Sequence, residues 1–273
     1  MRRGQASALF YCLLSHSSHS IRCLENRYDT IHLSKKYDNS RCWRLSDRVF
    51  TYASDTFIKR EVRPNERWLN LWGEPITAPW SAERLQNEAA TLQFISEHTT
   101  IPVPKVMSFE KIWGSYQLVV ERIDGIRLNA LEDDEEALKI ATKFITTSVL
   151  PQLRELKSPT IGSLMGIVIL PPRAKPFLPH KEKSWPAKTS FEPEYSFCHN
   201  DLSLDNILID PYTREVKAII DWEYSGFYPP GFEAPLWTMR PARQEYYALG
   251  APEIQCLVDF LSDPDAVSFQ SHN

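Results

Sequence analysis

Short apolar runs that end next to oxygen-bearing side chains constrain the fold of this chain more than any other feature. Residues 207–209 (ILI) and 216–220 (VKAII) have the composition of buried strands, and residues 211–214 (PYTR) between them have the composition of a turn. We therefore predict a hairpin. It would bring Asn206, which precedes the first strand, next to Asp221, which follows the second.

The predicted hairpin continues a signature of the form His199-x-Asp201-Leu-x-x-x-Asn206. Amide and carboxylate oxygens are the ligands that Mg²⁺ prefers, so Asn206 and Asp221 are candidates for a metal site, and Asp201 is a candidate base. A histidine two residues before an aspartate would by itself indicate a loop histidine beside a capping aspartate. The complete signature, with the hairpin and residues 218–223 (AIIDWE), favours a functional site.

At these residues the chain resembles the aminoglycoside phosphotransferase family, particularly its fungal members with a protein-kinase-like fold. The resemblance implies an α+β fold of two lobes, with a small antiparallel sheet and one main helix in the N-lobe and a mostly helical C-lobe. It further implies ATP-dependent phosphorylation of a hydroxyl group on a small molecule. In that scheme Asp201 is the base, His199 braces the loop, and Asn206 and Asp221 hold Mg²⁺.

Two departures from protein kinases bear on regulation. Asn200 stands where protein kinases carry an arginine that pairs with a phosphorylated activation loop. Residues 221–223 are Asp-Trp-Glu instead of Asp-Phe-Gly, which removes a flexible glycine. We therefore expect a constitutive small-molecule kinase and not a signalling kinase.

A strand and a helix upstream supply a second expected pair. Lys59 lies near the end of an apolar and β-branched stretch that begins at residue 48, and residues 85–95 have the apolar spacing of an amphipathic helix with Glu88 beside the apolar stripe. By resemblance Lys59 contacts the α- and β-phosphates and Glu88 holds its ammonium in place. Without the downstream signature, a surface lysine and a solvated glutamate would be the better interpretation.

The linker between the lobes is predicted from the strand that precedes it. Residues 116–121 (YQLVVE) have the composition of a buried strand, and residues 122–125 (RIDG) follow as the linker. By resemblance the main chain of Glu121 and Ile123 hydrogen-bonds adenine, a role that requires no particular side chain.

One expected element is missing from the sequence. No glycine lies between Gly4 and Gly73, so no glycine-rich phosphate loop precedes Lys59. Ser40, in the turn formed by residues 38–40 (DNS), is the candidate replacement, because some aminoglycoside kinases cover the phosphates with a serine-containing turn. An ordinary hairpin corner is at least as good an interpretation of this turn.

The composition argues against several classes of protein. A net charge of -4 does not indicate the positively charged surface that nucleic-acid binding requires, and five cysteines without a CxxC pair indicate neither a zinc site nor a disulfide framework. We expect ATP and Mg²⁺ as cofactors and a small-molecule hydroxyl as acceptor, with no nucleic-acid or membrane partner. The alternative is a catalytically silent, kinase-like module that binds nucleotide; the intact acids favour the enzyme.

The chain is expected to divide into three parts. Residues 1–26 form an N-terminal extension, residues 27–122 the nucleotide-binding N-lobe, and residues 123–273 the catalytic and acceptor-binding C-lobe. The first 24 residues contain three arginines and no acidic side chain, which fits a disordered extension and a mitochondrial targeting segment equally well. We expect a cytoplasmic location, with the mitochondrion as the alternative.

Overall fold

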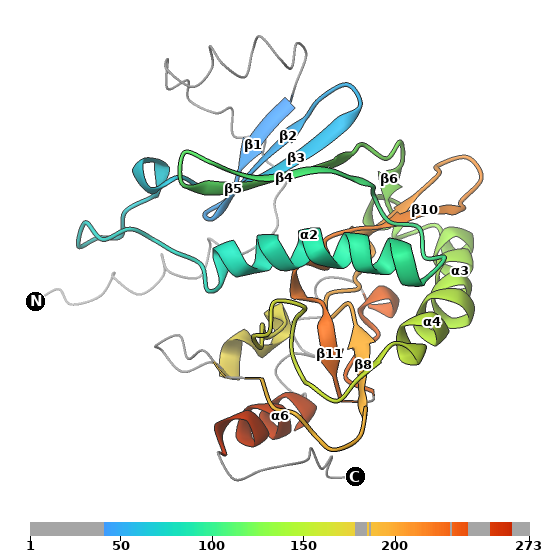
Figure 1. Ribbon diagram of the computed structural model, residues 1–273. Coiled ribbons are helices and arrows are strands. Elements are labelled where there is room, and N and C mark those ends of the chain that lie inside the picture. Colours follow the sequence, from blue (N-terminus) through green and yellow to red (C-terminus); the bar gives the residue numbers. More distant parts are fainter. Residues whose placement is uncertain (1–40, 178–184, 186, 230, 240–251, 264–273) are drawn as a thin grey trace, which may run out of the picture.

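The protein consists of an antiparallel sheet with one long helix and a second part made of helices, short strands and loops (Figure 1). The computed structural model describes residues 41–177, 185, 187–229, 231–239 and 252–263. The predicted α+β, protein-kinase-like architecture is confirmed. Within the part of the chain that is described, no helix has the length and apolar character needed to cross a membrane.

The sheet places Lys59 in its central strand. The strand of Lys59 pairs on both sides, with Phe50 and Leu118 directly opposite the lysine. This confirms the predicted strands at the lysine and at residues 116–121. In spatial order the strands are β1 (Arg41–Arg44), β2 (Arg48–Tyr52), β3 (Thr56–Glu61), β5 (Ser115–Glu121) and β4 (Val106–Ile112).

Helix α2 (Ser81–His98) lies along one face of this sheet (Figure 1). Its predicted apolar stripe is confirmed, since Leu85 and Ile95 are both 0% exposed and join a core that includes Leu118 of β5. Full burial of each such side chain contributes about 1.5 to 3 kcal/mol. The helix ends ahead of the proline-containing segment 101–104, where the prolines favour an extended chain.

The predicted hairpin is formed by β9 (Ile207–Ile209) and β10 (Val216–Ile219), which pair antiparallel. The Asp210 carboxylate accepts hydrogen bonds from two amides of the turn, and Arg214 closes the turn in a left-handed conformation with φ of 63°. Strand β6 (Ile126–Arg127) pairs with the other edge of β9.

A second small sheet carries the segment that leads into the His-x-Asp signature. Strand β8 (Tyr195–Cys198) lies between β7 (Lys157–Ser158) and β11 (Gly226–Tyr228). The 3-10 turn of residues Trp222–Tyr224 connects β10 to β11 and follows Asp221, whereas Asp201 lies between β8 and β9. Both aspartates therefore lie where the chain passes from one small sheet to the other.

The helical segment that contains Pro151 is divided into three parts. Helix α3 (Glu135–Phe144) continues through a π-helical turn (Ile145–Val149) into α4 (Leu150–Glu155), so the irregularity lies immediately before the proline. Helix α6 (Pro252–Ser262) packs against a separate apolar cluster. The remaining short 3-10 helices are Pro64–Glu66, Leu128–Leu131, Pro172–Phe177, Leu204–Asn206 and Leu236–Thr238.

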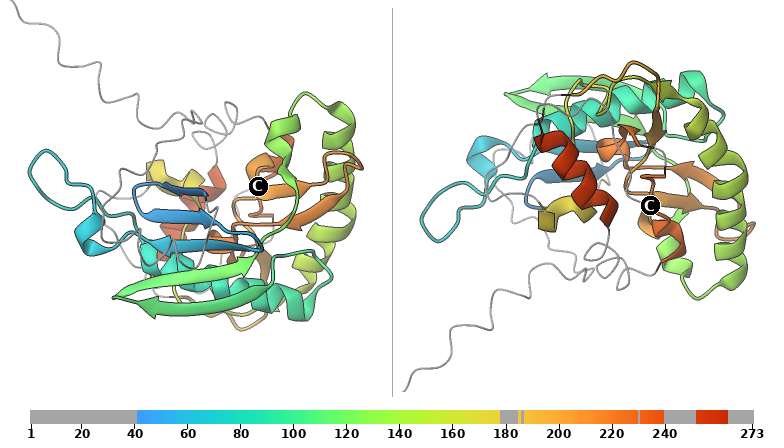
Figure 2. Two further views of the ribbon diagram at one scale, coloured as in Figure 1. Left: turned by 90° about the horizontal axis from the view of Figure 1, so that it is seen from above. Right: turned by 90° about the horizontal axis from the view of Figure 1, so that it is seen from below.

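The connection between β3 and α2 projects away from the rest of the molecule, as the views from above and below show (Figure 2). It carries several exposed apolar side chains, among them Leu71 at 87% and Trp72 at 83% exposure. Its order comes from hydrogen bonds within the loop, since the Asn70 side-chain oxygen accepts from the amides of Trp72 and Glu74, both at 2.9 Å.

Candidate active site

His199 is a buried brace for the signature loop. Its Nε2 lies 3.0 Å from the Ile220 carbonyl oxygen, its Nδ1 lies 3.2 Å from the Asp201 amide, and its ring packs on Trp222 with centroids 4.4 Å apart. Burial lowers the pKa of His199 to about 4, although the Ile220 carbonyl opposes this shift. The imidazole is therefore neutral near pH 7, donating through Nε2 and accepting at Nδ1.

Asp201 and Asn206 form one hydrogen-bonded unit. The Asn206 side-chain nitrogen donates to the Asp201 carbonyl at 2.7 Å and to its carboxylate at 3.1 Å. Burial, and then the charges of Asp221 and Glu223, raise the pKa of Asp201 well above its usual range. A carboxylate with a raised pKa is a stronger proton acceptor once it is ionised.

Lys59 brings three distant parts of the chain together. Its Nζ lies 2.9 and 2.7 Å from the two carboxylate oxygens of Glu88 and 2.6 Å from Oδ1 of Asp221. Burial disfavours the ammonium, but Asp221, Glu88 and Glu223 together raise the pKa of Lys59 above its usual value. The lysine is therefore charged, and the predicted pairing with Glu88 is present.

Asp221 occupies an unusual backbone conformation at the open side of this cluster. Its φ and ψ are 67° and 52°, and its side chain is 35% exposed, against 8% for Lys59 and 6% for Glu88. Asn200 is also left-handed, with φ of 68°. Such conformations are uncommon outside glycine and concentrate at functional sites.

The oxygen donors fit a hard cation. The hairpin places the Ile220 amide 3.0 Å from the Asn206 carbonyl, so the residues predicted to ligate Mg²⁺ lie on adjacent strand ends. Carboxylate oxygens of Glu88, Asp221 and Glu223 also lie within 4.8 Å of one another. Of these three side chains, that of Asp221 is the most exposed, which favours it over the other two as a ligand.

An aromatic cluster lies beside Lys59 and was not anticipated from the sequence. The strand register puts Phe50 opposite both Lys59 and Trp43, so these side chains share one face of the sheet. Tyr52 and Phe57 lie on the same face, with centroids 4.9 Å apart, and Trp43 stacks on Phe50 at 5.1 Å. Aromatic residues at alternate positions of three neighbouring strands were the available signal.

The predicted adenine contacts lie at the end of β5. The Glu121 amide donates to the Lys105 carbonyl at 2.9 Å, and the Arg122 amide donates to Asp55 at 2.9 Å. A base could therefore meet the Glu121 carbonyl or the main chain of Ile123, because the amides of Glu121 and Arg122 are already engaged. Ser40, the candidate for covering the phosphates, lies outside the described residues.

Two further charged residues hold the signature loop in place. The Glu233 carboxylate accepts from the amides of His199 and Asn200, the latter at 3.1 Å. Arg173, 6% exposed, donates to the carbonyls of Asn200 and Phe232, each at 2.6 Å. Sequence reasoning missed both residues, because single charges in a proline-rich stretch carry no periodic signal.

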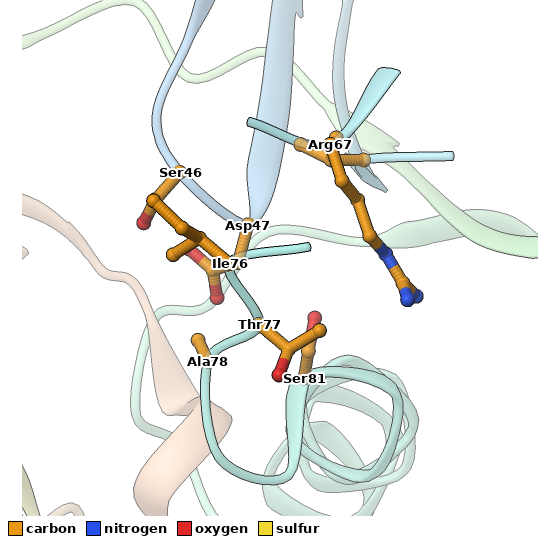
Figure 3. A pocket seen from close by; sticks show the side chains of 8 residues that line it. Ser46, Asp47, Arg67, Ile76, Thr77, Ala78 and Ser81 are labelled. Atoms are coloured by element: carbon orange, nitrogen blue, oxygen red, sulfur yellow. The ribbon is translucent and has the colours of Figure 1, made fainter. Parts of the chain in front are cut away.

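A small hollow lies at the base of the projecting loop (Figure 3). Of the described site residues, none lines it, so we do not associate it with the predicted chemistry. Its lining consists of Ser46, Asp47, Val62, Arg67, Ile76, Thr77, Ala78 and Ser81.

Comparisons with known proteins identify the same segment that carries the signature. Residues 171–245 match the Phosphotransferase enzyme family. The structure is similar to aminoglycoside phosphotransferase APH(3'')-Id from Streptomyces rimosus, with a TM-score of 0.50, 16% identity and coverage of 88% of this chain and 93% of the other. It also matches the streptomycin-ATP-APH(2")-IIa ternary complex, with a TM-score of 0.49, 11% identity and coverage of 88% and 92%.

A curated plant protein matches over a shorter stretch. A probable choline kinase 1 of Arabidopsis thaliana is 44% identical over 45 residues, which is 16% of this chain and 13% of that protein. The family match and the structural similarity together confirm the resemblance to the aminoglycoside phosphotransferase family. Residues 171–245 of this chain are thus similar in sequence to the Phosphotransferase enzyme family, and the chain has the protein-kinase-like fold of the aminoglycoside phosphotransferases.

Proposed function

We propose that this protein is an ATP-dependent phosphotransferase that phosphorylates a hydroxyl group of a small molecule. The observation that carries the proposal is the convergence of Lys59, Glu88 and Asp221. The three residues come from a strand, a helix and a distant turn, yet the Lys59 Nζ lies no more than 2.9 Å from carboxylate oxygens of both acids. A buried lysine between two carboxylates is costly to maintain for stability alone, and it is suited to binding phosphate.

The nucleotide would lie between the two lobes, which we place at residues 27–122 and 123–273. Its phosphates would meet Lys59, and its base would stack on the aromatic cluster on the same face of the sheet, where Tyr52 is 37% exposed. The main chain of Glu121 and Ile123 would bind the base edge. This stacking surface would supply binding that a glycine-rich loop supplies in other kinases, since the sequence before Lys59 lacks one.

The acceptor hydroxyl would be activated by Asp201. The carboxylate takes the hydroxyl proton while the hydroxyl oxygen bonds to the γ-phosphorus and the bond to the β-phosphate oxygen breaks, which releases ADP. Asn206 fixes one carboxylate oxygen, and His199 fixes the Asp201 amide. Mg²⁺ held by Asn206 and Asp221 would neutralise charge on the phosphate oxygens.

The second candidate function is a catalytically silent module that binds nucleotide. The observation that favours it is the lack of any glycine between Gly4 and Gly73, where the phosphates of ATP would be covered. The module and the enzyme make the same prediction for nucleotide binding. They differ in ADP release.

The deciding experiment combines binding with turnover. We expect ATP with Mg²⁺ to raise the melting temperature of the purified protein, and a panel of hydroxyl compounds to include one that stimulates ADP release. Asp201→Asn should keep nucleotide binding and reduce turnover by roughly 10² to 10⁴, the usual contribution of a general base. Asp210→Asn is the matched control, because Asp210 lies in the hairpin turn outside the site and asparagine can still accept its hydrogen bonds.

Binding without ADP release from any compound would favour the silent module. Full turnover in Asp201→Asn would remove Asp201 from the proposed mechanism.

A further inference from the structure

Helix α2 buries a polar stripe in addition to its apolar one. Arg84, Asn87, Glu88 and Thr91 follow the spacing of one helix face and are 6%, 0%, 5% and 0% exposed. Charged residues are almost never fully buried unless they are paired. This stripe therefore marks specific contacts. Glu88 meets Lys59, and the other three residues meet the segment of residues 221–225 that begins with Asp221.

Glu223 is the centre of that contact. Its Oε1 accepts from Nη1 of Arg84 at 2.8 Å, and its Oε2 accepts from Nη2 of Arg48 at 3.2 Å. Arg48 belongs to β2 and also donates to the carbonyl of Ser81, at the start of α2, at 2.6 Å. One carboxylate thus joins the sheet, the helix and the turn that carries Asp221.

Neutral hydrogen bonds extend the contact along the helix. The Asn87 side-chain nitrogen donates to the Ser225 carbonyl at 2.9 Å, and the hydroxyls of Thr91 and Ser225 lie 2.8 Å apart. Asn87 also accepts from the Leu164 amide at 3.1 Å, through its oxygen. Every polar group of the stripe consequently has a partner outside the helix.

The surroundings of Glu223 distinguish it from a metal ligand. Its carboxylate lies close to those of Glu88 and Asp221, but both of its oxygens are occupied by arginine side chains and only 11% of its side chain is exposed. Asp221 by contrast meets a lysine with one oxygen and is 35% exposed. Burial disfavours the charge on Arg84, yet Glu223, Tyr224 and Asp47 raise its pKa, so this cation stays paired with Glu223.

We propose that Glu223 is a positioning residue that fastens α2 to residues 221–225 and keeps the Lys59 and Glu88 pair aligned with Asp221 without any activating modification. Glu223 occupies the place where protein kinases have a flexible glycine, two residues after the metal-binding aspartate. The kinetic part of this inference rests on the proposed phosphotransferase function. The structural part does not.

The first test is amide hydrogen exchange of the nucleotide-free protein. Glu223→Gln should accelerate exchange in α2 while strands β4 and β5 keep the rate of the unmodified protein, because the loss of one charge weakens both arginine contacts. Glu66→Gln is the matched control. Glu66 is also a part-buried partner of an arginine, Arg60 at 2.7 Å, but it lies at the start of the projecting loop.

The second test is kinetic and separates positioning from metal binding. Glu223→Gln should raise KM for ATP about tenfold, leave KM for the acceptor and the Mg²⁺ concentration for half-maximal rate unchanged, and be partly rescued by Glu223→Asp. A raised Mg²⁺ requirement like that of an Asp221 variant would overturn the proposal in favour of a ligand role. Unchanged exchange of α2 would overturn it as well.

Thr91→Val covers the case in which Glu223→Gln does not fold. It removes one neutral hydrogen bond from the same contact and should accelerate exchange of α2 in the same direction by a smaller factor. Unchanged exchange in this variant would then overturn the proposal. A protein that binds no nucleotide but whose α2 responds to these substitutions would refute the proposed function and leave the positioning role intact.

Discussion

The two segments that adjoin α2 depart from the usual distribution of side chains in opposite directions. Residues 221–225 include a buried charged residue, Glu223 at 8% exposure of the whole residue, whereas the loop before the helix exposes Leu71 at 87% and Trp72 at 83%. Replacing buried ion pairs with apolar residues often stabilises a protein, so buried charge is weak evidence of a stabilising role and stronger evidence of a positional one. Leu71 and Trp72, by contrast, bury little area and therefore hold no other segment in place.

Among substitutions in these two segments, we expect a change at Asp221 to have the largest effect on activity. Asp221→Asn keeps the shape of the side chain but removes the charge that pairs with Lys59 and would ligate Mg²⁺. Activity should fall by roughly 10³-fold, and Mg²⁺-dependent ATP binding should weaken in a calorimetric titration. Asp55→Asn, on the exposed β2–β3 turn, is the control. Unchanged dependence on Mg²⁺ would contradict the ligand assignment.

The Lys59 and Glu88 pair should give the next largest effect. Lys59→Met and Glu88→Gln should each lower kcat/KM for ATP by roughly 10 to 10²-fold, because the first removes the ammonium and the second removes one of the two carboxylates that hold it in place. The double variant should be little worse than Lys59→Met alone. If instead the two losses simply multiplied, the residues would be acting independently, and the silent module would become the better interpretation.

The exposed loop should give the smallest effect. Trp72→Ser should change the free energy of unfolding by no more than about 0.5 kcal/mol in a denaturant titration, because the side chain loses almost no buried area. Leu85→Ala on the apolar stripe of α2 serves as the positive control and should cost about 2 to 5 kcal/mol. A comparable loss in both variants would mean that the loop contributes to the folded core.

Elements encoded by local pattern could be predicted from the sequence. The hairpin that joins Asn206 to Asp221, the strand of Lys59 and the apolar stripe of α2 all follow from short-range periodicity, and their positions agree with the structure. The pairing of Lys59 with Glu88 followed from the resemblance, since the two residues occupy fixed places in a known arrangement.

Contacts between distant segments could not be predicted. Arg48 and Arg84 each look like ordinary surface arginines in the sequence, and their partner Glu223 lies 175 and 139 residues away. The contacts of Glu233 and Arg173 with the signature loop could not be predicted for the same reason. A single charged residue in a sequence gives no indication of a partner that only the fold brings close. The π-helical turn of residues Ile145–Val149 depends on packing in the same way.

The left-handed backbone at Asn200 and Asp221 limits which sequences this site can accept. Asparagine and aspartate tolerate that conformation better than other residues with a Cβ atom, and most replacements would cost about 1 to 2 kcal/mol before any chemistry is affected. Substitutions at these two positions are therefore limited by the main-chain conformation as well as by any loss of catalysis. Even in a descendant of this protein that lost its activity, this conformation would disfavour most replacements at both positions.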